Sequence, residues 1–414
     1  MKSHPSCLDV FRPLNLSASE ERAIADEAGL VIQRTLTQEA EFRKQGGRIN
    51  LREWKQVRVE DGLAVYKQRK VPRTGYSSSM TDIDGDQEVS VPELLSNTAQ
   101  SAHSGNRWRF ASMDLLEFAT TISSSSGSNS GDSRVPAMLA AGHIEGKLED
   151  AMLGIFDGDE HAWKVRAGLI KDKFDEAQIL ATIRAPSEDE PFNFLGIKWF
   201  SVEYPKVVGS FIQKRDTLVM EALGIGIDEN GGKYGYSLLH DFRHPNLPEL
   251  KELGMLRSKL SMCFIFRQTS PTRVSLYSRG FVDGGGDLPK SIAIAITALS
   301  IVSNANAVET AYSRKLAWLV NSQAPQRRIA REEQRQSSSC RSCDKTPKLR
   351  GLTECHACGF SFCTKCTVHR KVVVGKHDTS VHSLSFCFGC VLQAKGLSPV
   401  EIARVTYVPS SDAP

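Results

Sequence analysis

The 414-residue sequence predicts an α+β protein with a helix-grip layout, in which a helix, a mostly antiparallel sheet and a long final helix precede a small cysteine-rich module. Three observations predict it. Segments of β-type alternation lie between two helical patterns, glycine-rich turns separate these segments, and eight of the ten cysteines follow position 339. The composition, 40% hydrophobic and 24% charged, is that of an ordinary globular protein.

The first predicted helix opens at a capping box formed by Ser17 and Glu20. Its apolar side carries Ile24, Ala28, Val31, Ile32 and Leu36. Trp54 and the stretch 63–66 then predict the first strand. Residues 73–133 are expected to be an insertion that ends in a serine-rich, disordered run.

Two short helices are predicted next, near 148–155 and 162–171. Alternating patterns predict six strands at 179–183, 195–202, 217–225, 234–241, 259–267 and 273–282. The last helix is expected to run through Trp318, with Asp287 as its N-cap and Pro289 in its first turn. Its longest mostly apolar stretch, 292–302, is far shorter than the ~20 residues of a membrane span.

Eight cysteines near the C-terminus form four C-x2-C pairs separated by 11, 4 and 20 residues. The pairs are Cys340 and Cys343, Cys355 and Cys358, Cys363 and Cys366, and Cys387 and Cys390. Four thiolates complete a tetrahedral shell, so the set predicts two zinc ions in closed, structural sites. Four disulfides are the alternative, but they need an oxidising compartment, and the N-terminus has no signal-peptide pattern.

The gaps between pairs indicate which cysteines share an ion. Four residues between the second and third pairs are few for two independent knuckles, so interleaved sites are expected. One site would use Cys340, Cys343, Cys363 and Cys366, and the other Cys355, Cys358, Cys387 and Cys390.

Residues 355–366, CHACGFSFCTKC, resemble the C-x2-C-G-x2-F-C-x2-C core of FYVE-type zinc fingers, over about 55 residues in all. A RING finger is the nearest alternative, although it usually has a histidine ligand and a shorter last gap. FYVE fingers that bind phosphatidylinositol 3-phosphate carry a basic signature around the third cysteine. Here those positions hold Gly351, Leu352, Thr353, Glu354 and His356. The resemblance therefore implies a structural finger that is degenerate for this lipid.

The finger is nevertheless basic. Residues 340–395 hold nine Lys or Arg and three Asp or Glu, a net charge of +6, whereas the whole chain is +4. Such a module can contact an anionic membrane weakly, or the charge can simply keep a small domain soluble. Nucleic acid is not expected as a partner, because the few aromatic residues flank the cysteines.

Four segments in a fixed order resemble the START lipid-binding family, over roughly residues 20–322. They are Trp54 to Tyr66, His143 to Met152, Gln213 to Asp216 and Val282 to Lys290. Together with the finger, they resemble START/FYVE proteins of oomycetes. The resemblance implies a deep apolar cavity between the sheet and the last helix, holding a sterol or the acyl chains of a phospholipid. Ala295 and Ala298 are considered as lining positions, and Arg215 with Asp216 as a surface ion pair or a head-group anchor.

No catalytic motif is recognised, so an enzyme is not expected. The acidic run 82–93 has Gln87 where a calcium loop needs glycine, and Gly224–Gly226 lacks the third glycine of a dinucleotide site. There is no nucleophile elbow and no phosphate loop.

The expected organisation is a tail (1–19), a START-like domain (20–322), a linker (323–339), a FYVE-like finger (340–395) and a second tail (396–414). The expected function is that of a cytoplasmic lipid-binding or lipid-sensing protein, peripheral at endosomal membrane. Two alternatives remain open. One is a protein-interaction adaptor without bound lipid, and the other is an endosomal phosphoinositide-binding FYVE protein.

Overall fold

The computed structural model describes residues 11–69, 88–90 (backbone only), 136–172, 176–202, 213–286, 288–334, 338–347, 351–375 and 377–409. The chain divides into two units, and each is described by itself. The sheet unit comprises Met1–Leu148, Phe174–Arg184 and Phe194–Ala305. The cysteine unit comprises Glu149–Lys173, Ala185–Asn193 and Asn306–Pro414.

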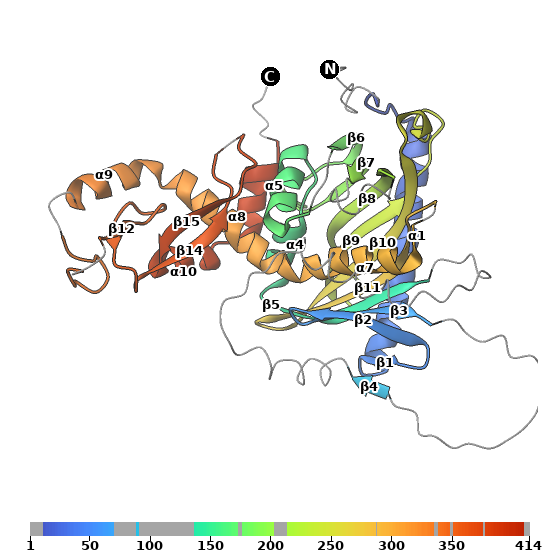
Figure 1. Ribbon diagram of the computed structural model, residues 1–414, viewed down its shortest axis with the longest axis horizontal. Helices are drawn as coiled ribbons and strands as arrows, with labels where there is room; N and C mark the ends of the chain where they lie inside the picture. The colour runs from blue at the N-terminus through green and yellow to red at the C-terminus, as the bar shows by residue number, and fades with distance from the viewer. Residues whose placement is uncertain are drawn as a thin grey trace, which may run out of the picture. The chain divides into compact units, whose positions relative to one another are not determined.

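In the described part of the sheet unit, the main sheet has nine strands, which follow each other in space as β2-β3-β5-β11-β10-β9-β8-β7-β6 (Figure 1). Their bounds, in that order, are Trp54–Glu60, Leu63–Gln68, Met138–Glu145, Arg273–Asp283, Leu256–Ser270, Lys233–Asp241, Arg215–Ile227, Phe194–Val202 and Glu176–Arg184. Neighbours in this order pair antiparallel, and the start of β10 also pairs parallel with the start of β8. The predicted α+β class with an antiparallel sheet is therefore confirmed.

The predicted first strand is two strands, because the chain turns between them. Asp61 and Gly62 both adopt positive φ angles, 48° and 83°, and the turn they form joins β2 to β3. Of the predicted insertion, only Glu88–Ser90 is described; it forms β4 and pairs with β1 (Arg48–Asn50). The rest of 73–133 and most of the acidic run lie outside the described residues.

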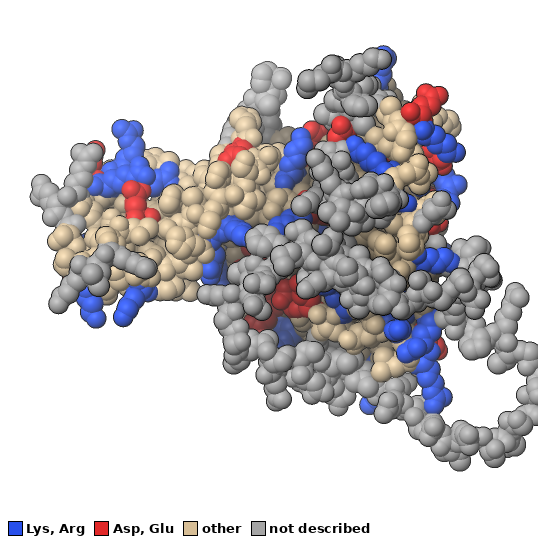
Figure 2. Space-filling view, in the orientation of Figure 1, with Lys and Arg blue, Asp and Glu red and all other residues tan. Residues whose placement is uncertain are grey.

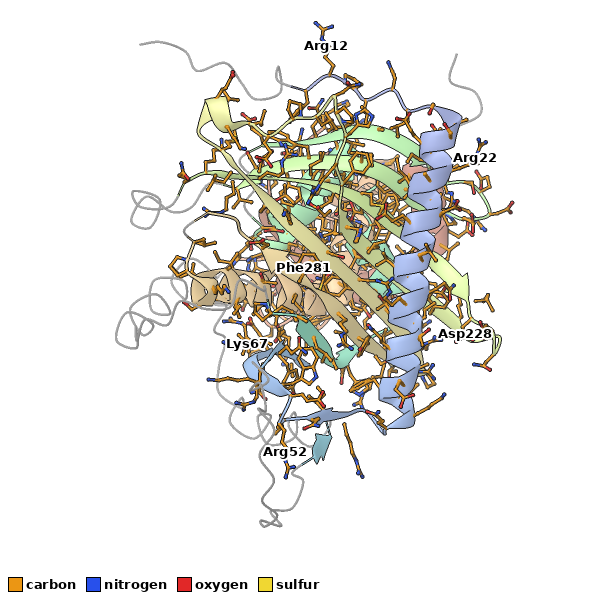
Figure 3. The ribbon with its side chains drawn as sticks, turned by 90° about the vertical axis from the view of Figure 1, so that its right-hand side faces the viewer. Arg12, Arg22, Arg52, Lys67, Asp228 and Phe281 are labelled. Atoms are coloured by element: carbon orange, nitrogen blue, oxygen red, sulfur yellow. The ribbon has the colours of Figure 1, made fainter. Side chains whose placement is uncertain are left out.

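Helix α1 (Ala18–Lys44) begins at the predicted capping box, in which Ser17 and Glu20 satisfy each other's backbone N–H groups. Its buried residues Ile24, Ala28 and Leu36 join one apolar cluster with β7, β8, β9 and β10. Figure 3 shows this helix lying across the strands. Part of the predicted N-terminal tail belongs to the same cluster, because Phe11 packs edge-on against Trp199 at 5.5 Å between ring centroids.

Helix α7 (Lys290–Val302) contacts β2, β3 and β11 on the other face of the sheet. On β5 and β11, Leu139 and Tyr277 belong to the cluster beside α1, whereas Met138 and Val282 line a cavity beside α7. Side chains alternate between the two faces of a strand, so the sheet lies between α1 and α7. This is the helix-grip arrangement predicted from the sequence.

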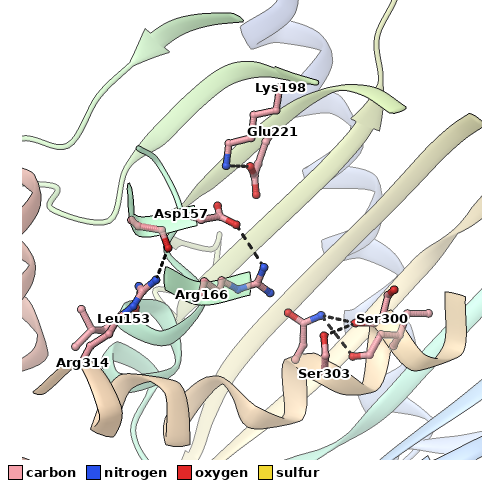
Figure 4. Close-up of polar contacts among 11 residues, drawn as sticks. Leu153, Asp157, Arg166, Lys198, Glu221, Ser300, Ser303 and Arg314 are labelled. Carbon is pink, nitrogen blue, oxygen red and sulfur yellow. Dashed lines mark hydrogen bonds and ion pairs between the residues drawn. The ribbon is translucent and has the colours of Figure 1, made fainter. Parts of the chain in front are cut away.

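The last helix differs from its prediction at its start and in its middle. It begins at Lys290, with Pro289 at the N-cap, and the predicted cap Asp287 lies outside the described residues. It is also interrupted by a 3-10 turn at Ser303–Asn306, after which α8 (Ala307–Ser322) continues. Ser303 and Asn304 donate side-chain hydrogen bonds to the carbonyl of Ser300, which competes with the helical pattern (Figure 4).

The whole stretch Lys290–Ser322 is long and apolar enough to cross a membrane by length and composition alone. The apolar stretch predicted from the sequence, 292–302, is shorter than this helical stretch. The signal is weak, because core helices of soluble proteins pass the same test and α7 covers the sheet.

The cysteine unit contains six helices within the described residues, and α8 is at its centre. The others are α4 (Leu148–Ile155, of which Leu148 falls to the sheet unit), α5 (Glu160–Ile170), α9 (Ala324–Gln334), α10 (Phe388–Gly396) and α11 (Pro399–Tyr407). Arg314 on α8 donates to the carbonyls of Leu153 and Ala162, and Lys315 pairs with Asp150 at 2.5 Å. Both contacts anchor α8 to α4 and α5 from buried positions.

The segments expected to be a linker and a C-terminal tail each contain a helix. The expected linker 323–339 contains α9, and the expected tail 396–414 contains α11, whose Ile402 and Ala403 are buried. Tyr407 packs against Phe156 with the ring centroids 4.4 Å apart and the ring planes tilted by 33°. The predicted domain boundaries themselves stay predictions.

Candidate ligand cavity and metal centres

The eight C-terminal cysteines gather in two groups of four, and the groups are the interleaved ones expected from the spacing. One holds Cys340, Cys343, Cys363 and Cys366, and the other holds Cys355, Cys358, Cys387 and Cys390. Within each group all four sulfurs lie within 4.8 Å of one another. Every cysteine in the described part of the chain is free of disulfides.

Short strands and one helix place these sulfurs. Strands β12 (Thr353–Glu354) and β13 (Ser361–Phe362) close the turn that holds Cys355 and Cys358. Strands β14 (Thr367–Val372) and β15 (His382–Cys387) bring Cys387 back beside it. Helix α10 begins there, with the Cys387 sulfur accepting the backbone N–H of Cys390. Gly359 closes the turn at a φ of 81°, which glycine adopts without strain.

The geometry suits a tetrahedral thiolate-bound metal. Zinc–sulfur bonds of about 2.3 Å place neighbouring sulfurs about 3.8 Å apart. The sulfurs of Cys343 and Cys363 are 3.8 Å apart. The pKa of Cys355 lies far below that of an ordinary thiol, because the thiols of Cys358, Cys387 and Cys390 donate to its sulfur. Each group therefore offers a full set of four ligands and leaves no position for a reacting water.

Helix α9 covers the side of the finger that carries Glu354 and His356. Arg331 pairs with Glu354 at 2.6 Å, and Arg327 donates to the carbonyl of His356. A Cβ on Gly359 would lie 2.6 Å from the Arg327 carbonyl oxygen, so helix and turn are in close contact. Figure 2 shows basic side chains gathered over this helix. The acidic Glu354 is thus neutralised from within the chain.

The sheet unit contains a cavity of about 190 Å³ beneath the first turns of α7. Its walls come from β5, β11, the glycine-rich turn and α7, and include Met138, Val282, Gly284, Gly285, Gly286, Leu288, Lys290, Ala293, Ile294 and Thr297. The cavity lies between the sheet and the last helix, where the START resemblance implies one. Ala295 and Ala298 are buried but do not line it.

Arg215 and Asp216 are not a surface ion pair, because both are buried. Arg215 is buried and donates to the carbonyls of Gly284 (2.6 Å), Gly285 (3.1 Å) and Gln213 (2.7 Å). Asp216 is also buried and accepts from Trp199 and Arg257, each at 2.8 Å. The surface option was wrong because nothing in the sequence places the glycine-rich turn beside the start of β8, and the head-group anchor stays a prediction. Arg215 instead fixes one wall of the cavity.

A buried ion pair that was not predicted joins Lys198 on β7 and Glu221 on β8 (Figure 4). Leu195, Ile197 and Trp199 on β7 face α1, so Lys198 points to the opposite face, the one that α7 also covers. Its ammonium lies 4.9 Å from the ring centroid of Phe194. Opposite charges on two adjacent predicted strands were a usable signal, but only the register brings them together.

Cys263 is buried in the sheet as expected, and burial raises the pKa of its thiol to about 12. It is therefore an unreactive core residue. Cys7, the remaining cysteine, lies outside the described residues.

No protein-family model matches the chain, and no curated protein matches it. Among solved structures, human StAR-related lipid transfer protein 5 is 14% identical with a TM-score of 0.40, covering 70% of this chain and 97% of that one. The human StarD13 lipid transfer and protein localization domain is 11% identical with a TM-score of 0.34, covering 67% and 95%. A STAR-related lipid transfer protein from Xanthomonas axonopodis is 10% identical with a TM-score of 0.31, covering 63% and 96%.

Proposed function

We propose that the sheet unit binds one lipid under α7 and that the cysteine unit is a structural zinc module. The observation that carries this proposal is the cavity between the sheet and α7. Cavities that take small amphiphiles are mostly apolar with a few polar groups. Here Met138, Val282 and Ile294 supply apolar wall, while Lys290 and Thr297 supply polar groups. The ligand would be a sterol or the acyl part of a phospholipid, as the START-like segments imply.

The buried pair Lys198–Glu221 supports an amphiphilic ligand rather than a pure hydrocarbon. Desolvating two charges is costly, and a well-packed apolar pair is often at least as stable. An ion pair on the face of the sheet opposite α1 therefore favours a role in ligand binding, such as hydrogen bonding to the hydroxyl or head group of a lipid. Phe194 lies beside Lys198. None of these three residues lines the cavity of about 190 Å³, so a ligand that reaches them must extend beyond it along the sheet.

The cavity is smaller than the ~300–1,000 Å³ of most ligand pockets. A whole lipid thus requires α7 to shift outward, and uptake should loosen the contacts that α7 makes with β2 and β3. Vesicle uptake assays test the proposal directly. Protein incubated with vesicles of labelled sterol or labelled phosphatidylcholine, then separated by size, should carry about one label per chain. Folded protein that takes up neither label would favour the adaptor alternative.

For the cysteine groups we propose zinc, because four thiolates in a tetrahedron are typical of structural zinc sites. Thiolate tetrahedra also suit iron, so the metal must be measured. The finger would stabilise its unit and contact anionic membrane weakly, in a cytoplasmic, peripheral protein without catalytic activity. Recognition of phosphatidylinositol 3-phosphate is not proposed, because Glu354 stands where the FYVE signature is basic and is paired with Arg331.

A further inference from the structure

Helix α10 presents two large apolar side chains to solvent. Phe388 is 52% exposed and Leu392 is 69% exposed. Four residues separate them, so they lie on the same face of the helix, one turn apart. The opposite face is buried through Cys390, Val391 and Ala394. Cys387 and Cys390 belong to the second cysteine group, so this cluster fixes the orientation in which the apolar pair is displayed.

Basic residues accompany this apolar pair. Lys395 is exposed and follows Leu392 by three residues on α10, and its ammonium lies 4.7 Å from the ring centroid of Tyr312 on α8. Lys365 is exposed and precedes Thr367, whose backbone pairs with Cys387 at the start of α10. The surrounding finger, 340–395, has a net charge of +6. A partner of this face is therefore expected to be anionic and to accept two apolar side chains.

We propose that the face formed by Phe388, Leu392, Lys365 and Lys395 docks on an anionic phospholipid bilayer. The two apolar side chains enter the boundary between head groups and acyl chains, and the two lysines lie at the level of the phosphates. A folded protein partner is disfavoured by size, because stable protein interfaces bury about 1,200–2,000 Å² and two side chains supply a small part of that. This docking rests on the proposed function in one respect, that it would bring the lipid-binding sheet unit to its source of lipid.

The test uses the full chain and sedimentation with vesicles of phosphatidylcholine, with and without phosphatidylserine. Wild type should bind the phosphatidylserine vesicles and lose binding as salt rises. The double variant Phe388→Ser/Leu392→Ser should bind on the order of tenfold more weakly. Lys365→Glu/Lys395→Glu should lower binding to the anionic vesicles and flatten its salt dependence.

Matched controls come from the same unit. Ile329 on α9 is 60% exposed and Val405 on α11 is 72% exposed, so Ile329→Ser and Val405→Ser remove comparable apolar surface elsewhere. Both should bind vesicles like wild type. Metal content and circular dichroism must be unchanged in all variants, which separates docking from folding.

The proposal is wrong if wild type does not bind anionic vesicles, if the double variant binds as well as wild type, or if the controls lose binding equally. A concentration-dependent dimer that the double variant abolishes would also overturn it, in favour of a second copy as occupant. Loading with lipid from detergent micelles tests the cavity separately, because the double variant should still load there. Failure of docking and failure of lipid binding are thus distinguishable.

Discussion

Lys198 and Glu221 form an ion pair across β7 and β8 with side chains only 1% and 5% exposed to solvent. Each charge compensates the other in a place where neither could stay charged alone at low cost. The pair lies on the face of the sheet opposite α1, and α7 lies on that same face over β2, β3 and β11. We therefore expect substitutions of this pair to change both the stability of the fold and the choice of ligand.

Replacing Lys198 with Met should destabilise the fold by about 3–5 kcal/mol, because the buried Glu221 loses the ammonium that compensates its charge. The double variant Lys198→Met/Glu221→Leu should recover most of that stability, since the pair becomes apolar. Urea unfolding of the three proteins checks this. If the single variant is as stable as wild type, Glu221 is not held in a dry environment and the account of this pair is wrong.

The same double variant should still take up lipid but with altered preference between sterol and phospholipid, because the polar contact is gone. Competition between the two labelled lipids measures this. Unchanged preference would mean that the pair is structural only.

Replacing Arg215 with Met should cost on the order of 2 kcal/mol of stability, because charged hydrogen bonds to the carbonyls of Gly284 and Gly285 are lost. The same substitution should also weaken lipid retention, because Gly284 and Gly285 line the cavity. Arg22 is exposed on α1, so Arg22→Met is the matched control and should change neither the stability nor the lipid retention. If the Arg215 variant is destabilised but retains lipid as well as wild type, the glycine-rich turn does not contribute to lipid binding.

The full chain should hold two zinc ions, and Cys355→Ser should lower that to about one because it removes a ligand of the second group. Cys263→Ala is the control and should keep both ions. Metal binding contributes about 10–16 kcal/mol per site in zinc-finger peptides, so a strong chelator should unfold the finger. Elemental analysis that finds iron, or fewer than two metal ions in wild type, would contradict this.

Vesicle binding should not distinguish phosphatidylinositol 3-phosphate from other lipids of equal charge. Glu354 is paired with Arg331, and the Nδ1 atom of His356 lies 3.2 Å from the carbonyl oxygen of Ser385. Sedimentation at physiological salt, with phosphoinositides matched in charge, checks the prediction. Selective retention on the 3-phosphate would restore the endosomal FYVE alternative.

Local patterns predicted the parts of the structure that depend on local physics. The capping box at Ser17 begins α1, the helix 148–155 has the predicted bounds, and the cysteine spacing predicted both groups. Spacing suffices for the cysteines because two residues between thiolates leave few geometries.

Long-range contacts could not be predicted in this way. Whether Arg215 contacts a glycine-rich turn 69 residues away depends on how β8 and β11 are placed in the sheet. The pairing of Lys198 with Glu221 likewise needs the register of β7 against β8. The side-chain hydrogen bonds of Ser303 and Asn304, which interrupt the last helix, are local contacts. In the sequence, however, the apolar pattern around these two residues is the stronger signal, and it predicts an unbroken helix.

The most direct test of lipid binding is native mass spectrometry of the intact protein with a cavity-filling variant. Ala293 lines the cavity and is half-buried, so Ala293→Trp fills it with limited cost to folding. Ser300→Trp, on an exposed position of the same helix, is the control. Wild type and Ser300→Trp should each carry one lipid per chain, and Ala293→Trp should be empty. Folded wild type without lipid, even after incubation with vesicles, or an Ala293→Trp protein that loads normally, would contradict the account.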